Sequence, residues 1–402
     1  MKLKIVKFLD LAVEYSIYFL IFYIPISIAA VSTFVIIALV LFLIKKILLP
    51  DFISLKSNKL FFILFILFFI FLALSLINSG PLLAKSIKAL FLKWGRFVLI
   101  IWMLTDTFRD SKRIVKGVSV FLFSAIMVGI SALSQKFFGL EFLRHRQFAM
   151  GGITGPFGNR NDLASYLICI IPLALSFSLS SWKRISVKIG FCLISIILIA
   201  CLVLIHCRGS WIGLTAGLIF LTIFLNKKSI PSKILWFILI MGYCVCMPLM
   251  AIALYSLKNN DMRVELYHGA WKMITEHPFL GKGLGTFMDY SALPAYNLIA
   301  CYAHNCYLQI WAEAGIFSLL SFLVLNGYVL LKSIRVLFKM PVSLNFFILI
   351  GLTSGYLGIL VHCFFDTQLY SFQLSFVFWI ILGLTVASSN NEGKRCLSNL
   401  QE

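Results

Sequence analysis

The chain has 402 residues, of which 61% are hydrophobic and only 12% are charged, and it contains 39 phenylalanines. A soluble domain needs far fewer apolar residues to build a core, so this composition excludes an ordinary soluble protein and indicates a polytopic membrane protein. In so apolar a chain, the formal net charge of +20 indicates contact with anionic lipid headgroups rather than with nucleic acid.

The apolar runs predict about twelve membrane-spanning helices, because a bilayer span takes roughly 20 apolar residues. In chain order they cover approximately residues 10–24, 28–49, 60–77, 88–104, 114–134, 163–180, 187–206, 210–226, 234–256, 306–331, 344–364 and 368–388. The sequence therefore predicts an all-α, polytopic fold that forms a single membrane domain over residues 1–402. Because the start Met1-Lys2-Leu3-Lys4 has no small-residue cleavage site, we expect the first span to be retained.

The basic residues predict the orientation of these spans. When the chain alternates across the membrane, most of the 35 lysines and arginines fall on the side of the N-terminus, and cytoplasmic loops carry such an excess. Both termini are therefore expected inside. We interpret the inner clusters, such as Lys45-Lys46 and the basic residues of 109–116, as topology signals that meet lipid headgroups. This orientation leaves two longer outer segments, residues 135–162 and 257–305.

The first outer segment ends in the run Thr154 to Asp162, whose glycines and proline indicate a turn. We expect Asn161 or Asp162 to cap a helix that begins near Leu163. Arg160 and Asn161 would offer hydrogen-bond donors beside the N-terminus of that helix, where an anion binds readily. A capped helix without a ligand explains the run equally well.

Two further arginines lie on the outer side. Arg208 falls in a very short connection between the seventh and eighth predicted spans, so it must lie close to the membrane surface. Charged side chains at that depth are costly and usually mark a site. Arg263 lies in the large outer segment between the ninth and tenth spans. Two arginines that converge could bind phosphate oxygens bidentately.

The large outer segment contains two more patterns. Apolar residues recur at helical spacing and predict an amphipathic helix lying on the bilayer face; they are Leu266, Ala270, Trp271 and Ile274. The run Gly281-Lys282-Gly283-Leu284-Gly285 follows. No strand precedes it and it faces away from cytoplasmic nucleotides, so we interpret it as a tight turn that returns the chain to the membrane.

His304 opens the run to Gly315 at the mouth of the tenth span. Histidine side chains titrate near neutral pH, so one at this junction can handle protons beside a bilayer. Glu313 follows nine residues later, on the opposite helix face, and we expect it to pair inside the bundle with a basic or polar group of another span. Asp366, in the last short outer turn, is the better candidate to orient His304 or an arginine.

These residues resemble the O-antigen ligase/polymerase family of bacterial membrane glycosyltransferases, which share a Wzy-C type domain. The resemblance rests on the turn of residues 155–161, on Arg208-Gly-Ser-Trp, on Arg263 with the downstream run of residues 277–283, and on the run from His304-Asn305 to Glu313-Ala-Gly315. It implies a GT-C-like transferase of about twelve helices. The donor would be an undecaprenyl-diphosphate-linked glycan, used on the outer face of the cytoplasmic membrane.

The resemblance also implies roles for individual residues. Arg208 and Arg263 would bind the diphosphate, and His304 with Asp366 would be catalytic. By their place in this sequence, Arg160 and Asn161 are expected to extend the diphosphate site, and Asn305 and Glu313 to support it. Ligases of this family often show a second histidine before the His-Asn pair, where this chain has Tyr302-Ala303.

We therefore predict a metal-independent, inverting glycosyltransferase without a cofactor. The first outer loop, residues 23–27, has no acidic residue, and the carboxylates of the other outer segments are scattered. A hard cation needs a set of oxygen ligands close together. The favoured activity is an O-antigen ligase with lipid A-core as acceptor; a polysaccharide polymerase that extends one lipid-linked glycan with another is the alternative. A polyprenol-glycan transporter, an alternative of another class, would more often place its charges along a central path.

Overall fold

The computed structural model describes residues 2–148, 152–180, 185–228, 261–290 and 302–398. Within these ranges the chain is helical, and the extended pairing is one isolated bridge between Leu140 and Gln147. Nine helices of the described part are long and apolar enough to cross a membrane. The predicted all-α polytopic fold is thereby confirmed.

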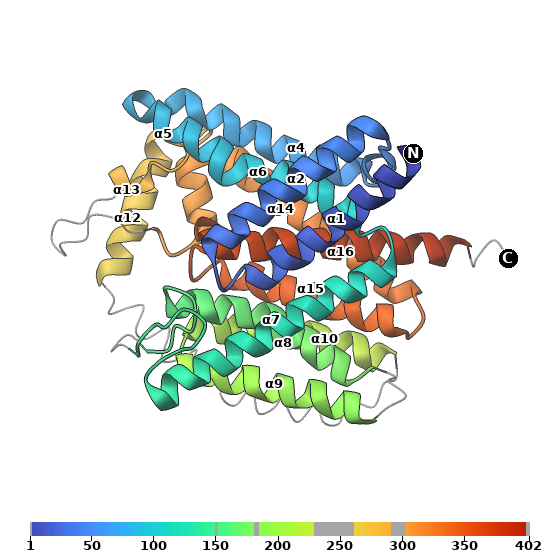
Figure 1. The fold of residues 1–402 in the computed structure, drawn as a ribbon. Helices are drawn as coiled ribbons and strands as arrows, with labels where there is room; N and C mark the ends of the chain where they lie inside the picture. The colour runs from blue at the N-terminus through green and yellow to red at the C-terminus, as the bar shows by residue number, and fades with distance from the viewer. Residues whose placement is uncertain (1, 149–151, 181–184, 229–260, 291–301, 399–402) are drawn as a thin grey trace.

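Each predicted span but one coincides with a helix. The helices are α1 (Lys2–Tyr23), α2 (Ile28–Leu48), α4 (Lys59–Leu74), α6 (Arg96–Thr107), α7 (Ser111–Phe138), α8 (Arg160–Ser178), α9 (Ile185–Ile205), α10 (Arg208–Lys227), α14 (Cys306–Lys339), α15 (Leu344–His362) and α16 (Phe372–Ser398). The ninth predicted span, 234–256, lies outside the described residues. In Figure 1 the start of α1 and the end of α16 lie at one end of the bundle and α12 (Asp261–Glu276) lies at the other. Which end faces the cytoplasm stays a prediction.

The fourth span differs from the single regular helix expected over residues 88–104. It consists of α5 (Leu83–Lys88), a π-helical segment η3 (Ala89–Gly95) and α6. The wider turn changes which side chains face the bundle, and hydropathy alone cannot reveal it. Such π-helical turns occur frequently at functional sites.

Helices α8, α10 and α15 pack through glycines. A Cβ atom at Gly213 would lie 2.6 Å from the carbonyl oxygen of Gly358, and one at Gly355 would lie 2.0 Å from that of Cys169. Small residues let helix backbones approach closely in membranes, where dispersion contacts rather than water exclusion hold helices together. The position of α10 against α15 matters because α10 begins, and α15 ends, at the site described below.

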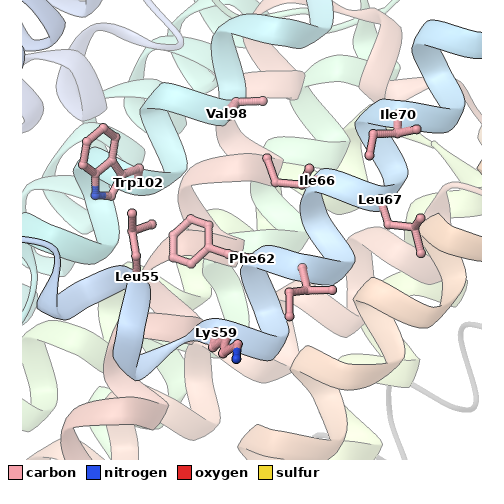
Figure 2. A pocket seen from close by; sticks show the side chains of 9 residues that line it. Leu55, Lys59, Phe62, Ile66, Leu67, Ile70, Val98 and Trp102 are labelled. Atoms are coloured by element: carbon pink, nitrogen blue, oxygen red, sulfur yellow. The ribbon is translucent and has the colours of Figure 1, made fainter.

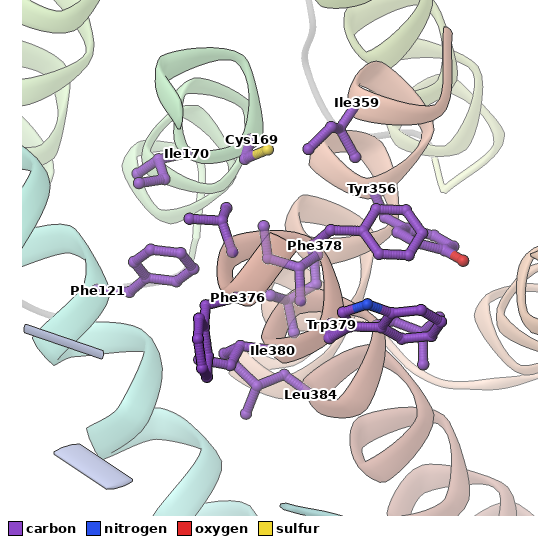
Figure 3. Packing of buried hydrophobic residues seen from close by; sticks show 14 of the residues in the cluster. Phe121, Cys169, Ile170, Tyr356, Ile359, Phe376, Phe378, Trp379, Ile380 and Leu384 are labelled. Atoms are coloured by element: carbon purple, nitrogen blue, oxygen red, sulfur yellow. The ribbon is translucent and has the colours of Figure 1, made fainter. Parts of the chain in front are cut away.

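Helix α16 lies in the middle of the bundle (Figure 1) and is almost wholly buried. Its Phe378 packs against Tyr356 of α15 and against the neighbouring Trp379 (Figure 3). The hydroxyl group of Tyr356 donates a hydrogen bond to Asn326 of α14, so this buried polar group is satisfied. These contacts fix α14, α15 and α16 relative to one another.

The clustering of basic residues such as Lys45 and Lys46 suggested contacts with lipid headgroups. In the structure these residues also form ion pairs with acidic side chains. Asp106 accepts hydrogen bonds from Lys46 at 2.8 Å and from Lys45 at 3.3 Å. Arg113 lies 3.0 Å from Glu14 of α1. Around them is a polar cavity of about 320 Å³. The acidic partners lie far away in the chain, so sequence clustering shows only the cations.

A second cavity, of about 610 Å³, lies between α4 and α6 (Figure 2). Its lining is apolar apart from Lys59, and consists of Leu55, Lys59, Phe62, Ile63, Ile66, Leu67, Ile70, Val98 and Trp102. The lining contains no acid and no histidine, so the candidate residues His304, Asp366 and Glu313 lie outside this cavity.

Candidate active site

His304 and Asp366 are hydrogen-bonded, with 2.9 Å between Nδ1 of the ring and Oδ1 of the carboxylate. Their side chains are 25% and 11% exposed, so solvent or a substrate can reach the histidine while the carboxylate is largely covered. His304 has a φ of 48°, a left-handed conformation that is uncommon outside glycine. It turns the chain sharply into α14.

The helix behind His304 is fixed by its first residues. The side chain of Asn305 caps α14 by accepting hydrogen bonds from the amides of Tyr307 and Leu308, at 3.0 and 3.1 Å. The amide of Cys306 donates to the carbonyl of Cys363 at 2.8 Å. The start of α14 is therefore tied to the turn that carries Asp366.

Asp366 is held in its charged form. Burial alone would raise its pKa, but the hydrogen bond from His304, the charges of His362 and His304, and the amide of Thr367 together hold the pKa of this carboxyl below its usual range. A carboxylate accepts the N–H of the ring nitrogen it faces. Nδ1 of neutral His304 therefore carries the proton, and Nε2 is left as the basic nitrogen.

A second histidine, His362, lies close enough to Asp366 for the charge of that carboxylate to act on it. Its ring is buried, with Nδ1 2.7 Å from the amide nitrogen of Gln368 and 3.0 Å from the hydroxyl of Ser165. Nε2 lies 3.8 Å from the sulfur of Cys207. It connects α15, α8 and the start of α10, which no local pattern could indicate.

Arg208 is the first residue of α10, and its side chain is exposed. A Cβ atom at the next residue, Gly209, would lie 2.6 Å from Cβ of Phe365 and 3.0 Å from the ring of His362. Only a glycine allows this approach. The Arg-Gly pair therefore brings Arg208 to the turn that carries Asp366.

Arg263 lies on α12 and is half-buried. Its charge acts on Tyr267 and on His362, and so does the charge of Asp366. Arg263 and Asp366 therefore share one electrostatic neighbourhood, although the two residues are far apart in the chain. The two arginines lie on different helices, α10 and α12, and their convergence on His304 stays a prediction.

The apolar face of α12 was expected to lie on the bilayer, but other parts of the protein cover it. Leu266, Ala270 and Ile274 are buried in a small cluster with Ala312 of α14, so protein covers this face. Trp271, which belongs to the same pattern, is 55% exposed. Amphipathic periodicity shows that a face is covered, but not what covers it.

Helix α8 begins at Arg160, three residues before the expected start. Its cap is Asn159, whose side chain accepts from the amide of Asn161 at 2.8 Å, so the prediction that Asn161 or Asp162 is the cap is wrong. Asp162 instead accepts from the hydroxyl of Ser371 at 2.7 Å, a tertiary contact that competes with capping. Arg160 is exposed, and its charge and that of Asp366 both act on Cys207.

Glu313 is buried and binds the large outer segment. It accepts hydrogen bonds from the amides of Gly285 and Phe287, at 2.9 and 3.2 Å, and from Gln309 at 2.9 Å. Its hydrogen-bond partners are thus backbone amides of the large outer segment and Gln309 of its own helix, and not the basic or polar group of another span that we expected. Nearby, α14 is interrupted at Gly315, whose φ is 81°. A Cβ atom there would lie 2.1 Å from the carbonyl oxygen of Phe279, so the glycine turn fits against the interruption.

In the ranges that the structure describes, no group of three or more His, Cys, Asp or Glu side chains could hold a metal ion. The candidate residues of the described part include one hydrogen-bonded His-Asp pair, His304 and Asp366.

The fold and site define a polytopic all-α membrane protein with a cluster of polar and charged side chains at one end of its bundle. The family model for O-antigen ligase matches residues 193–323, a segment that includes Arg208, Arg263, His304 and Glu313. The chain thus carries an O-antigen ligase domain, and the family resemblance seen in its motifs is confirmed. No curated protein matches the chain.

Proposed function

We propose that this protein is a glycosyltransferase that moves a glycan from undecaprenyl diphosphate to an acceptor on the outer face of the cytoplasmic membrane. The favoured acceptor is lipid A-core, which makes the activity that of an O-antigen ligase. The observation that carries the proposal is the His304–Asp366 hydrogen bond at 2.9 Å. It lies at the end of the bundle where Arg208 and Arg263 are found, and His304 belongs to the matched domain.

The proposed chemistry is a single inverting displacement. The acceptor hydroxyl oxygen forms a bond to the anomeric carbon of the donor while the bond from that carbon to the diphosphate oxygen breaks. The electron pair leaves with the lipid diphosphate, and the hydroxyl proton passes to Nε2 of His304. Asp366 stabilises the imidazolium that forms. General base catalysis of this kind contributes about 10²- to 10⁴-fold in rate.

The leaving group gains negative charge as its bond to the sugar breaks. Arginine side chains stabilise this negative charge, because the planar guanidinium donates two parallel hydrogen bonds to a pair of phosphate oxygens. Arg208 and Arg263 would stabilise the departing diphosphate in this way, as preorganised cations do in group transfer. Arg160 and Asn161 at the start of α8 would extend the same site. In this scheme no metal ion and no cofactor takes part.

Glycan analysis of a strain that lacks the gene tests the proposal. Loss of attached glycan with retention of the lipid-linked polymer supports a ligase. If only single repeat units remain, the protein is a polymerase. If the lipid-linked glycan accumulates on the inner face, the protein is a transporter and the proposal is wrong.

A further inference from the structure

Two cations of the interrupted fourth span lie against aromatic rings. Lys93 lies in η3, and Arg96 is the first residue of α6; each is half-buried. Nζ of Lys93 lies 4.4 Å from the ring centroid of Tyr370 and 5.2 Å from that of Tyr302. The guanidinium of Arg96 lies 4.6 and 4.7 Å from the ring centroids of Phe372 and Phe376.

Aromatic rings are the main neighbours of these cations. Among the described residues no acid forms an ion pair with Arg96, and its Nε is buried without a hydrogen-bond partner. The acid with the largest charge effect on Lys93 is Glu313, whose carboxylate already binds Gly285, Phe287 and Gln309. Cations at membrane depth without a counterion are costly and usually belong to a functional site.

The pair lies beside the segments that carry His304 and Asp366. Tyr302, which contacts Lys93, precedes His304 by two residues, and Tyr370 follows Asp366 by four. Figure 1 places α6 and α10 on opposite sides of α16. Arg208 and the Lys93–Arg96 pair therefore belong to segments that lie on opposite sides of α16.

We propose that Lys93 and Arg96 bind an acidic group of the acceptor, a phosphate or a carboxylate carried by its glycolipid. This inference rests on the proposed function. The displacement releases one diphosphate, which Arg208 and Arg263 would bind. We therefore assign the second cation pair to an anion of the other substrate, the acceptor. Either acceptor class fits, since a phosphorylated glycolipid and a second lipid diphosphate are both anionic.

The test compares kinetics with three forms of one acceptor, the membrane glycolipid extracted from cells that lack the enzyme. One form is native, one is dephosphorylated with hydrofluoric acid, and one has its carboxylates esterified. With wild-type protein, removing the phosphate or carboxylate that Lys93 and Arg96 bind should raise the acceptor KM about tenfold or more. The donor KM should stay unchanged. Lys93→Gln and Arg96→Gln should raise the acceptor KM for the native form similarly, with little further rise on removal of the group.

Charge-retaining and distant variants complete the design. Lys93→Arg and Arg96→Lys should keep more of the acceptor affinity than the glutamine variants. Lys85→Gln is the control, because Lys85 is a largely exposed cation paired with Asp289, and it should behave as wild type. Three results would overturn the proposal. They are a rise in the donor KM in the glutamine variants, an equal response of wild type and variants to removal of the acidic group, and an unchanged acceptor KM with both treated acceptors.

A second measurement depends on neither activity nor the folding of a variant. An amine reagent should modify Lys93 of the wild-type protein more slowly with the native acceptor than with the form that lacks the bound group, as mass spectrometry of the Lys93 peptide would show. Equal rates would overturn the proposal. If the wild-type protein transfers no glycan at all, the proposed function fails, whereas this protection still tests the anion site by itself.

Discussion

Glu313 accepts a hydrogen bond from the backbone amide of Gly285 at 2.9 Å, and this contact joins two parts of the site. Gly285 belongs to the outer segment that also carries Arg263, whereas Glu313 lies on the helix that begins just after His304. The amide of Gly283 adds a bond to the carbonyl of Glu313 at 2.9 Å. We infer that Glu313 sets the position of the arginine-bearing segment relative to the histidine.

Glu313→Gln should lower stability by about 1.5–3 kcal/mol, because buried hydrogen bonds to a charged acceptor are replaced by weaker ones. Transfer should also slow, since the outer segment is less firmly held. The unfolding temperature in detergent and the transfer rate measure the two effects. Glu276→Gln is the control, because Glu276 is exposed and its ion pair with Lys282 is 3.6 Å long. Equal stability of the two variants would contradict this role.

Gly209→Ala should displace the start of α10 from the Asp366 turn, because the added methyl group would lie 2.6 Å from Cβ of Phe365. Overpacking of this kind costs about 1–3 kcal/mol, and the transfer rate should fall with it. Gly190→Ala is the matched control in α9, where the methyl group meets nothing within 4 Å. Alanine there should be neutral or stabilising. Wild-type activity of Gly209→Ala would show that the close approach is dispensable.

Arg208→Lys and Arg263→Lys should each lose much of the activity while keeping their charge, because lysine lacks the planar fork that binds two phosphate oxygens. The donor KM and the transfer rate with purified protein test this. Arg335→Lys, far along α14 from His304, should behave as wild type. Bidentate diphosphate binding is the wrong explanation if both site variants match that control.

Asp366→Asn should reduce transfer by about 10²-fold or more, because the amide no longer stabilises the imidazolium. The stability effect has a defined sign. The pKa of Asp366 is depressed below 3.8 in the fold, so its contribution is fully present above that value and is lost as pH falls through the folded pKa. The difference in unfolding temperature between wild type and Asp366→Asn should thus stay constant from about pH 8 to 5 and shrink only below about pH 4. A difference that disappears near pH 6 would contradict this assignment.

Metal independence is tested with chelators. If arginines carry the charge of the leaving group, EDTA should leave the transfer rate of the purified enzyme almost unchanged, because no divalent ion contributes to the transition state. Mg²⁺ or Mn²⁺ is then added back. A large loss that either ion restores would rule out the arginine mechanism and direct attention to Asp366 and Glu313 as ligands.

Much of the fold could be predicted because a bilayer span leaves an apolar run in the sequence. The interruption at Ala89–Gly95 could not, since a π-helical turn leaves hydropathy unchanged. In the site, the polar residues stand out in an apolar chain, but their pairings do not. His304 and Asp366 are 62 residues apart, and the rings against Lys93 and Arg96 come from the other half of the chain. Contacts of that range depend on how the helices pack.

The transfer rate of purified His304→Ala protein tests the central claim most directly. The variant should bind the lipid-diphosphate donor as wild type does, because the arginines remain, and should lose transfer by about 10²-fold or more, because no base accepts the acceptor proton. His268→Ala, which removes an exposed histidine of α12, should retain the wild-type rate. A near-normal rate in His304→Ala, with donor binding intact, would contradict the account.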